Sequence, residues 1–283
     1  MADEKKKFLK LFIDGRLKST RVEIMSKYNQ RPLIDGETCL HVMSRVVQKR
    51  FLIDDHGMKE LRRILRTQAA FAGLDVITFC FLKNHFHVLL HIDPERAKEV
   101  VSDEILIERF LALYGTRRSS TLGVDADQLT MVLERGGDRA AVIRAKLTAR
   151  MGDISVFMRE FKTRFTFWYN KHYQTVGTFW AERFRSVLVE PKSSALKVVA
   201  AYIDLNAVRA GMAKTPQDYP YCGFGEAASG QISAQLAYQW LPHDRPHDSG
   251  ANVPSRRAFS EYECFVNRLV ATMSGTKRVS DLA

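Results

Sequence analysis

The stretch "LDVITFCFLKNHFHVLLHID" (residues 74–93) contains two apolar runs that only Lys83 and Asn84 separate. The first run is rich in β-branched and aromatic residues, which favour β-strands. Two strands joined by two residues pair as an antiparallel hairpin. The stretch therefore predicts the centre of an antiparallel sheet.

The second run carries three histidines on one face, because strand side chains alternate between faces. His85 and His87 are neighbours there, and their ring nitrogens are suited to bind one metal ion. His91 lies about 13 Å from His87, at about 3.3 Å per residue, which is too far for the same ion. The alternative is two surface histidines on a half-exposed sheet, and the motif alone does not decide between them. The opposite face is expected to enter the core through Phe86, Val88 and Leu90.

The segments around this hairpin predict an α+β protein. Strands are expected at 38–53 and, as one strand or a short pair, at 176–190. Helices are expected at 58–73, 104–115, 138–152, 153–173, 193–208 and 255–275. This order is βαββαβ-like with an inserted helical block at about 95–150. It predicts an antiparallel sheet with helices on one face.

Composition narrows the class of partner. The chain has 283 residues, of which 46% are hydrophobic, and 43 Lys and Arg against 32 Asp and Glu give a net charge of +11. This balance favours nucleic acid or an anionic membrane surface as partner. Cys39 and Cys80 lie in apolar runs and are expected to be small buried side chains rather than disulfides. With neither a signal-peptide pattern nor an apolar run of about 20 residues, a cytoplasmic protein without a membrane span is expected.

A second candidate feature is the segment "AAYIDLNAVRAG" (200–211). Tyr202 and Asn206 are four residues apart and share a face if the segment is helical. Taken alone, the segment favours a core tyrosine and an asparagine near a helix end. Tyrosine is a poor nucleophile because its phenol ionises only at about pH 10. A nearby metal ion would remove that obstacle by activating the electrophile.

These segments together resemble a known family. "FLKNHFHVLLHI" looks like the HUH motif of the single-tyrosine transposases of bacterial insertion sequences. "AAYIDLNAVRAGM" followed by "DYPYCGFG", and "GTFWAERFRSVLVE" before them, resemble conserved blocks of the related REP-associated tyrosine transposases, in the family's order. The resemblance covers about 37–225, leaving 1–36 as a lead-in and 226–283 as a C-terminal extension.

The resemblance implies a ferredoxin-like or RRM-like fold and a metal-dependent single-stranded DNA transposase or endonuclease. It makes His85, His87 and Asn206 the ligands of Mg²⁺ or Mn²⁺, and Tyr202 the nucleophile that forms a 5′-phosphotyrosine. Single-stranded DNA, with or without hairpins, is the implied partner. A homodimer is one arrangement that the family allows, since its tyrosine acts within its own subunit's site or in a partner's.

The chain departs from the family pattern at two places. Ala207 stands where the family usually has proline, which lets the helix continue more readily. The separation between His87 and Trp180 is also longer than in the family, which is consistent with an inserted block.

Basic and aromatic residues suggest where DNA would bind. The candidate DNA-binding residues are Lys162, Arg164, Arg183, Arg185 and Arg209. Arg183 and Arg185 share a face if they lie on one strand. Interleaved aromatic residues such as Phe167, Trp168 and Trp180 are either base-stacking platforms or core, and core is favoured. The basic residues are alternatively a plain solvated surface, and Arg209 alternatively interacts with the end of its own helix.

The competing hypothesis is a non-catalytic RNA- or DNA-binding module on an RRM-like sheet. It accounts for the charge and the aromatic residues without a metal ion. The distance of the histidines from Tyr202 and Asn206 in the folded chain discriminates between the two. A domesticated element that has lost mobility is not distinguished from either by the sequence.

Overall fold

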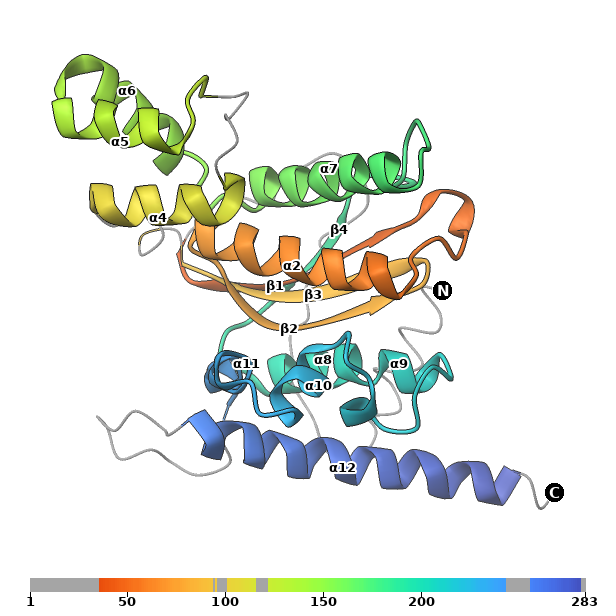
Figure 1. The fold of residues 1–283 in the computed structure, drawn as a ribbon. Helices are drawn as coiled ribbons and strands as arrows, with labels where there is room; N and C mark the ends of the chain where they lie inside the picture. Colours follow the sequence, from red (N-terminus) through yellow and green to blue (C-terminus); the bar gives the residue numbers. More distant parts are fainter. Residues whose placement is uncertain (1–35, 94, 96–100, 116–121, 243–254, 281–283) are drawn as a thin grey trace.

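The computed structural model describes residues 36–93, 95, 101–115, 122–242 and 255–280 (Figure 1). Four antiparallel strands form one sheet in the order β2-β3-β1-β4. The strands are β1 (Thr38–Arg45), β2 (Asp75–Leu82), β3 (His85–Ile92) and β4 (Arg185–Val189). Helix α2 connects β1 to β2, and α7 comes before β4, so the order is that of a ferredoxin-like βαββαβ unit. The predicted α+β class is confirmed; the predicted lead-in at 1–36 lies outside the described residues, except for Gly36.

The β2–β3 hairpin forms as predicted, with Lys83 and Asn84 as its connection. Phe86, on the face predicted to enter the core, is fully buried. Its ring makes edge contacts with Phe161 and Trp180, with centroids 5.3 and 5.2 Å apart. This places α7 against that face of the sheet, which is the main core of the protein.

Helices α2 (Asp55–Ala72) and α7 (Ile154–His172) lie side by side on this face (Figure 1). The side chain of Asp54 caps the start of α2 by accepting from the backbone N–H of Gly57. Gly73 ends the helix with a left-handed backbone, φ 66°, which glycine adopts without strain. The helix predicted at 58–73 therefore exists and begins three residues earlier.

Helices also cover the other face of the sheet, which the prediction of helices on one face did not include (Figure 1). That prediction holds for α2 and α7. The second layer contains α8 (Ser194–Asp204), α9 (Asn206–Arg209), α10 (Gly223–Ala228), α11 (Ile232–Ala237) and α12 (Ser255–Ser280), with short 3-10 helices at Pro216–Asp218 and Tyr238–Trp240. These helices cover the second face because the C-terminal extension contributes apolar side chains to the main core. The buried side chains are Tyr238, Leu241, Phe259, Tyr262 and Val266.

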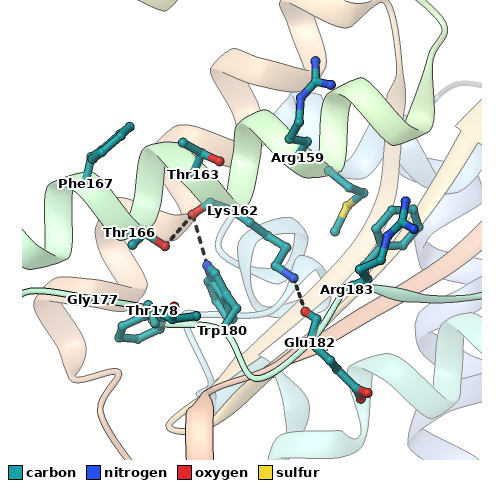
Figure 2. Close-up of a pocket in the computed structure, with 13 residues that line it drawn as sticks. Arg159, Lys162, Thr163, Thr166, Phe167, Gly177, Thr178, Trp180, Glu182 and Arg183 are labelled. Carbon is teal, nitrogen blue, oxygen red and sulfur yellow. Dashed lines mark hydrogen bonds between the residues drawn. The ribbon is translucent and has the colours of Figure 1, made fainter.

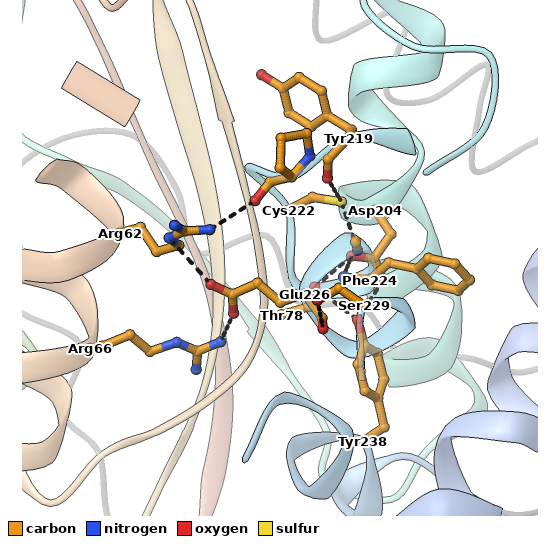
Figure 3. A network of polar contacts seen from close by, with 12 residues as sticks. Arg62, Arg66, Thr78, Asp204, Tyr219, Cys222, Phe224, Glu226, Ser229 and Tyr238 are labelled. Atoms are coloured by element: carbon orange, nitrogen blue, oxygen red, sulfur yellow. Dashed lines mark hydrogen bonds and ion pairs between the residues drawn. The ribbon is translucent and has the colours of Figure 1, made fainter. Parts of the chain in front are cut away.

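Polar contacts join the two helical layers around the edge strand β2. Glu226 of α10 is almost fully buried and pairs with Arg62 and Arg66 of α2 (Figure 3). The backbone N–H of Phe81 in β2 donates to the carbonyl of Tyr221, 2.9 Å away. The 219–222 segment thus pairs with the sheet edge that would otherwise be open.

The inserted block is helical, as expected, within its described residues. It contains α4 (Asp103–Tyr114), α5 (Ala126–Arg135) and α6 (Gly137–Thr148). Its core is separate from the main one and includes Phe110, Leu129 and Leu147, with Phe71 of α2 as the connection. The side chain of Ser102 caps the start of α4 by accepting from the backbone N–H of Ile105.

Both flanking strands are shorter than predicted. After β1 the chain turns into a 3-10 helix, Val47–Lys49, where Gln48 and Lys49 have left-handed backbones. In the 176–190 segment only β4 is a strand, and an isolated bridge joins Trp180 to Val46. Arg183 therefore precedes the strand, and the prediction that Arg183 and Arg185 share a face of one strand is wrong.

Cys39, Cys80 and Cys222 are buried free thiols, and Cys264 is exposed. The first two are small buried side chains, as predicted. In the part of the chain that the structure describes, no helix combines the length and the apolar character needed to cross a membrane.

Candidate active site

Three imidazoles lie together on the sheet face beneath α8. His85 and His87 of β3 have ring centroids 5.1 Å apart, and His41 of β1 is also 5.1 Å from His87. The strand register gives the reason, because Met43 pairs with His87 and His41 lies two residues further on the same face. Sequence reasoning missed His41. Its only signal is an imidazole inside the apolar strand "TCLHVMSR", with no second histidine at a metal-binding spacing.

A hydrogen bond fixes the tautomer of His85. The amide nitrogen of Asn84 donates to the carbonyl of Lys49 at 3.2 Å, which leaves the Asn84 Oδ1 as acceptor. His85 Nδ1 lies 2.6 Å from that oxygen and must therefore carry the proton. Burial, together with the charge of Arg45, lowers the pKa of His85 to about 4. His85 is thus neutral at pH 7, with a lone pair on Nε2, which is the form that binds metal ions.

His87 is also oriented through its Nδ1, which lies 2.9 Å from His41 Nε2. Both side chains are buried, at 4% exposure. One nitrogen donates and the other accepts. If His87 donates, its lone pair lies on Nε2, as in His85. A partner at the second ring nitrogen is what orients metal-binding histidines in proteins.

Tyr202 and Asn206 approach this face from α8 and α9. The ring of Tyr202 lies edge-on to both buried histidines, with centroids 5.8 Å from His87 and 6.2 Å from His41. Helix α8 is capped by Ser193, whose side chain accepts from the backbone N–H of Leu196. Tyr202, from a segment far from the hairpin in the sequence, therefore lies beside His87, which in turn lies beside His85.

The predicted single helix at 193–208 is interrupted at Leu205 and continues as the short α9. Hydrogen bonds bridge the interruption, because the backbone N–H of Arg209 donates to the carbonyl of Leu205 at 3.0 Å. The Asn206 amide nitrogen donates to the carbonyl of Tyr202 at 2.7 Å. This bond leaves the amide oxygen of Asn206 as the atom that suits a metal ion.

Arg209 is the one predicted basic residue that contacts Tyr202 directly. Its guanidinium carbon lies 5.2 Å from the centroid of the Tyr202 ring, within the range of a cation–π contact. The Arg209 side chain is exposed. A positive charge is therefore held beside the phenol, at the solvent side of the site.

The other predicted basic residues do not contact these groups in the contacts described. Arg164 lies over the ring of Tyr114, 4.8 Å from its centroid, and so ties α7 to the inserted block. Arg185 pairs with Glu182 at 2.6 Å. Lys162 donates to the carbonyl of Glu182 at 2.5 Å. Lys162 and Arg183 line a groove beside α7, and Arg185 flanks it through its pair with Glu182.

His91 belongs to a different network, separate from His85 and His87. Its Nδ1 lies 3.2 Å from Asp75 and its Nε2 lies 3.0 Å from Glu37. Trp240 stacks on the ring with centroids 3.6 Å apart. His91 therefore helps to fasten the C-terminal extension to the sheet.

The donor set of the site fits a metal ion only if the amide oxygen takes part. Among the described residues, no group of three or more His, Cys, Asp or Glu side chains is placed to hold one. His85, His87 and Asn206 instead offer two imidazole nitrogens and one amide oxygen. Imidazole suits softer ions than Mg²⁺, so this set favours Mn²⁺ over Mg²⁺.

Comparisons with known proteins include a likeness to a solved structure. No protein-family model matches the sequence, and no curated protein is significantly similar to it. A solved structure described as a REP-associated tyrosine transposase bound to a REP hairpin is similar at 16% sequence identity and a TM-score of 0.44. The match covers 81% of this chain and 96% of that one. A likeness at this level assigns neither a family nor an activity to this chain.

Proposed function

We propose that the protein is a metal-dependent enzyme that cleaves and rejoins single-stranded DNA through Tyr202. The observation that carries the proposal is the edge-on contact of Tyr202 with His87, next to His85 on the same sheet face, where Asn84 fixes the tautomer of His85. A tyrosine beside a metal-binding pair has the components needed for covalent phosphoryl transfer.

In this proposal His85, His87 and Asn206 hold a divalent ion, Mn²⁺ or Mg²⁺. When bound, the ion supplies charge that polarises a non-bridging oxygen of the scissile phosphate. The contacts that support this assignment hold the side-chain atoms that would not face the ion. Asn84 holds the Nδ1 of His85, and the helix carbonyl of Tyr202 holds the amide nitrogen of Asn206.

Tyr202 supplies the nucleophile. Its phenol oxygen attacks the phosphorus, a 5′-phosphotyrosine bond forms, and the bond to the 3′ oxygen breaks. The phenol loses a proton and the departing 3′ oxygen gains one, so the step is neutral overall. Attack on the adduct by another 3′-hydroxyl reverses these changes and releases Tyr202, with no nucleotide cofactor consumed. Arg209 places a positive charge beside the ring, where negative charge develops.

The test is adduct formation on labelled, hairpin-bearing single strands with Mn²⁺. Wild-type protein is expected to give a denaturation-resistant protein–DNA band, and Tyr202→Phe is expected to abolish it. Tyr114→Phe, on the inserted block, is the matched control and should retain the band. Undiminished cleavage by Tyr202→Phe contradicts the proposal.

The non-catalytic alternative is weakened by the fold. RRM modules read bases on an open sheet face. In this protein α2 and α7 cover one face and α8–α12 the other (Figure 1). In β3 every residue after His85 is buried, so these strand positions are not accessible to stack on bases.

A further inference from the structure

A groove of about 500 Å³ lies between α7 and the 177–184 segment (Figure 2). Helix α7 is on the opposite side of the sheet from α8, so this groove is not the site of Tyr202 (Figure 1). Its walls combine cations, hydroxyl groups and aromatic rings, among them Arg159, Lys162, Thr166, Phe167, Trp180 and Arg183.

The groove carries net positive charge. Arg159 and Arg183 are exposed at its rim. The acidic side chain of Glu182 pairs with Arg185 at 2.6 Å and is therefore compensated. Lys162 lies deeper, and burial lowers its pKa to about 8. It still carries a proton on average at pH 7, so three cations face a ligand here.

The aromatic residues of the groove differ in role. Trp180 is buried, and its indole N–H donates to the carbonyl of Lys162 at 3.1 Å, so it forms part of a fixed wall. Phe167 is 71% exposed, although it lies on a helix whose other phenylalanines are buried. An exposed aromatic ring on a rigid helix, beside cations, is the arrangement with which single-strand binders stack bases.

The groove is continuous in sequence with the active-site face. The 177–184 segment leads directly into the edge strand β4. Arg185 is the first residue of β4 and lies opposite Met43 of β1, which lies opposite His87 of β3. Arg185 is therefore on the sheet face that carries the histidines. A DNA strand that lies in the groove can therefore pass around the edge strand β4 to the sheet face that carries the histidines.

We infer that this groove binds single-stranded nucleic acid, with phosphates on Arg159 and Arg183 and a base stacked on Phe167. The inference deepens the proposed function by assigning a second contact for the same DNA strand, away from the reacting phosphate. Base stacking accounts for the exposed ring of Phe167, and phosphate contacts account for the two arginines at the rim, Arg159 and Arg183.

The test measures binding of a fluorescently labelled 12-nucleotide oligo-dT to the full chain by anisotropy, across a range of salt concentrations. Phe167→Ala is expected to weaken binding about tenfold, the scale of one lost base stack. Arg183→Gln is expected to weaken binding and to reduce the salt slope by about 0.7, the value for one phosphate of a single strand.

Phe51→Ala is the matched control, because Phe51 is 76% exposed and not part of the groove. Thermal unfolding of each variant verifies that the fold is intact. Binding that is unchanged in both Phe167→Ala and Arg183→Gln overturns the inference, as does a loss in Phe51→Ala equal to that in Phe167→Ala.

The outcome is separable from that of the Tyr202 proposal. Loss of oligo-dT binding in the groove variants supports the inference even if Tyr202 forms no adduct. Adduct formation by a protein whose groove variants bind like wild type supports the Tyr202 proposal and overturns the inference.

Discussion

Replacing Asp204 by alanine should destabilise the protein strongly. Asp204 ends α8, two residues after Tyr202, and is completely buried. Four groups donate to its carboxylate. Figure 3 labels the donors from β2, α10 and the 3-10 helix at Tyr238–Trp240, and the fourth donor comes from α12. They are the Thr78 hydroxyl at 2.5 Å, the Tyr262 hydroxyl at 2.7 Å, and the Tyr238 hydroxyl and Phe224 backbone N–H at 3.3 Å each.

The magnitude follows from what alanine leaves behind. The Tyr238 hydroxyl also lies 3.3 Å from the Thr78 oxygen, so these two groups can still pair with each other. The Tyr262 hydroxyl and the Phe224 N–H then lose the acceptor described here. Each buried donor without a partner costs about 1–3 kcal/mol, so the expected loss in free energy of unfolding for the two donors is about 2–6 kcal/mol. That is a large part of the roughly 5–15 kcal/mol that stabilises a typical domain.

The assay is urea unfolding at pH 7, followed by circular dichroism, for wild type, Asp204→Ala and a control. Asp218→Ala is suitable, because Asp218 is exposed and accepts only from Thr215 in the contacts described, at 2.6 Å. The control should lose no more than about 0.5 kcal/mol, as surface substitutions generally do. A loss below about 1 kcal/mol for Asp204→Ala, or one equal to the control, would refute the reasoning.

Three further predictions follow from single groups. Burial raises the pKa of Asp204 from its ordinary 3.8 to about 7, so the folded state binds more protons here between these values. Wild type should therefore lose stability relative to Asp204→Asn as pH rises from about 4 to about 7, and parallel profiles in pH-dependent urea unfolding would contradict this. Gly225→Ala should unfold at a lower temperature by calorimetry, because its Cβ would collide with the backbone oxygen of Tyr219, and an unchanged midpoint would show that the turn yields. His41→Phe should weaken Mn²⁺ binding 10–100-fold by titration calorimetry, because it removes the partner of His87; unchanged affinity would exclude an orienting role.

The parts of the site with a regular spacing could be predicted from the sequence. His85 and His87 follow the two-residue period of a strand, and Tyr202 and Asn206 are separated by a helical turn. His41 could not be predicted in this way. It is a single imidazole in a different strand, and only the pairing of β1 with β3 brings it to His87.

The exposure of the aromatic residues at the groove could not be predicted from the sequence either. Phe167 and Trp180 were treated alike from the sequence, because both are aromatic residues among basic ones. Trp180 is 6% exposed because it lies beyond α7 and packs on Phe86 of β3, whereas Phe167 is on the outer side of α7 and is 71% exposed. The prediction that Arg183 and Arg185 share a strand face was wrong because β4 begins only at Arg185.

The C-terminal extension supports helix α8 and is not simply an appended segment. Tyr238 and Tyr262 both lie in it, and both donate to Asp204 at the end of α8. Because Asp204 is two residues from Tyr202, the backbone that positions Tyr202 is fixed by side chains that come later in the chain. A buried carboxylate is stable in the core only while its donors are present. Removing the extension would therefore leave Asp204 buried with fewer donors or exposed to water, and in either case would loosen the α8 turn that carries Tyr202.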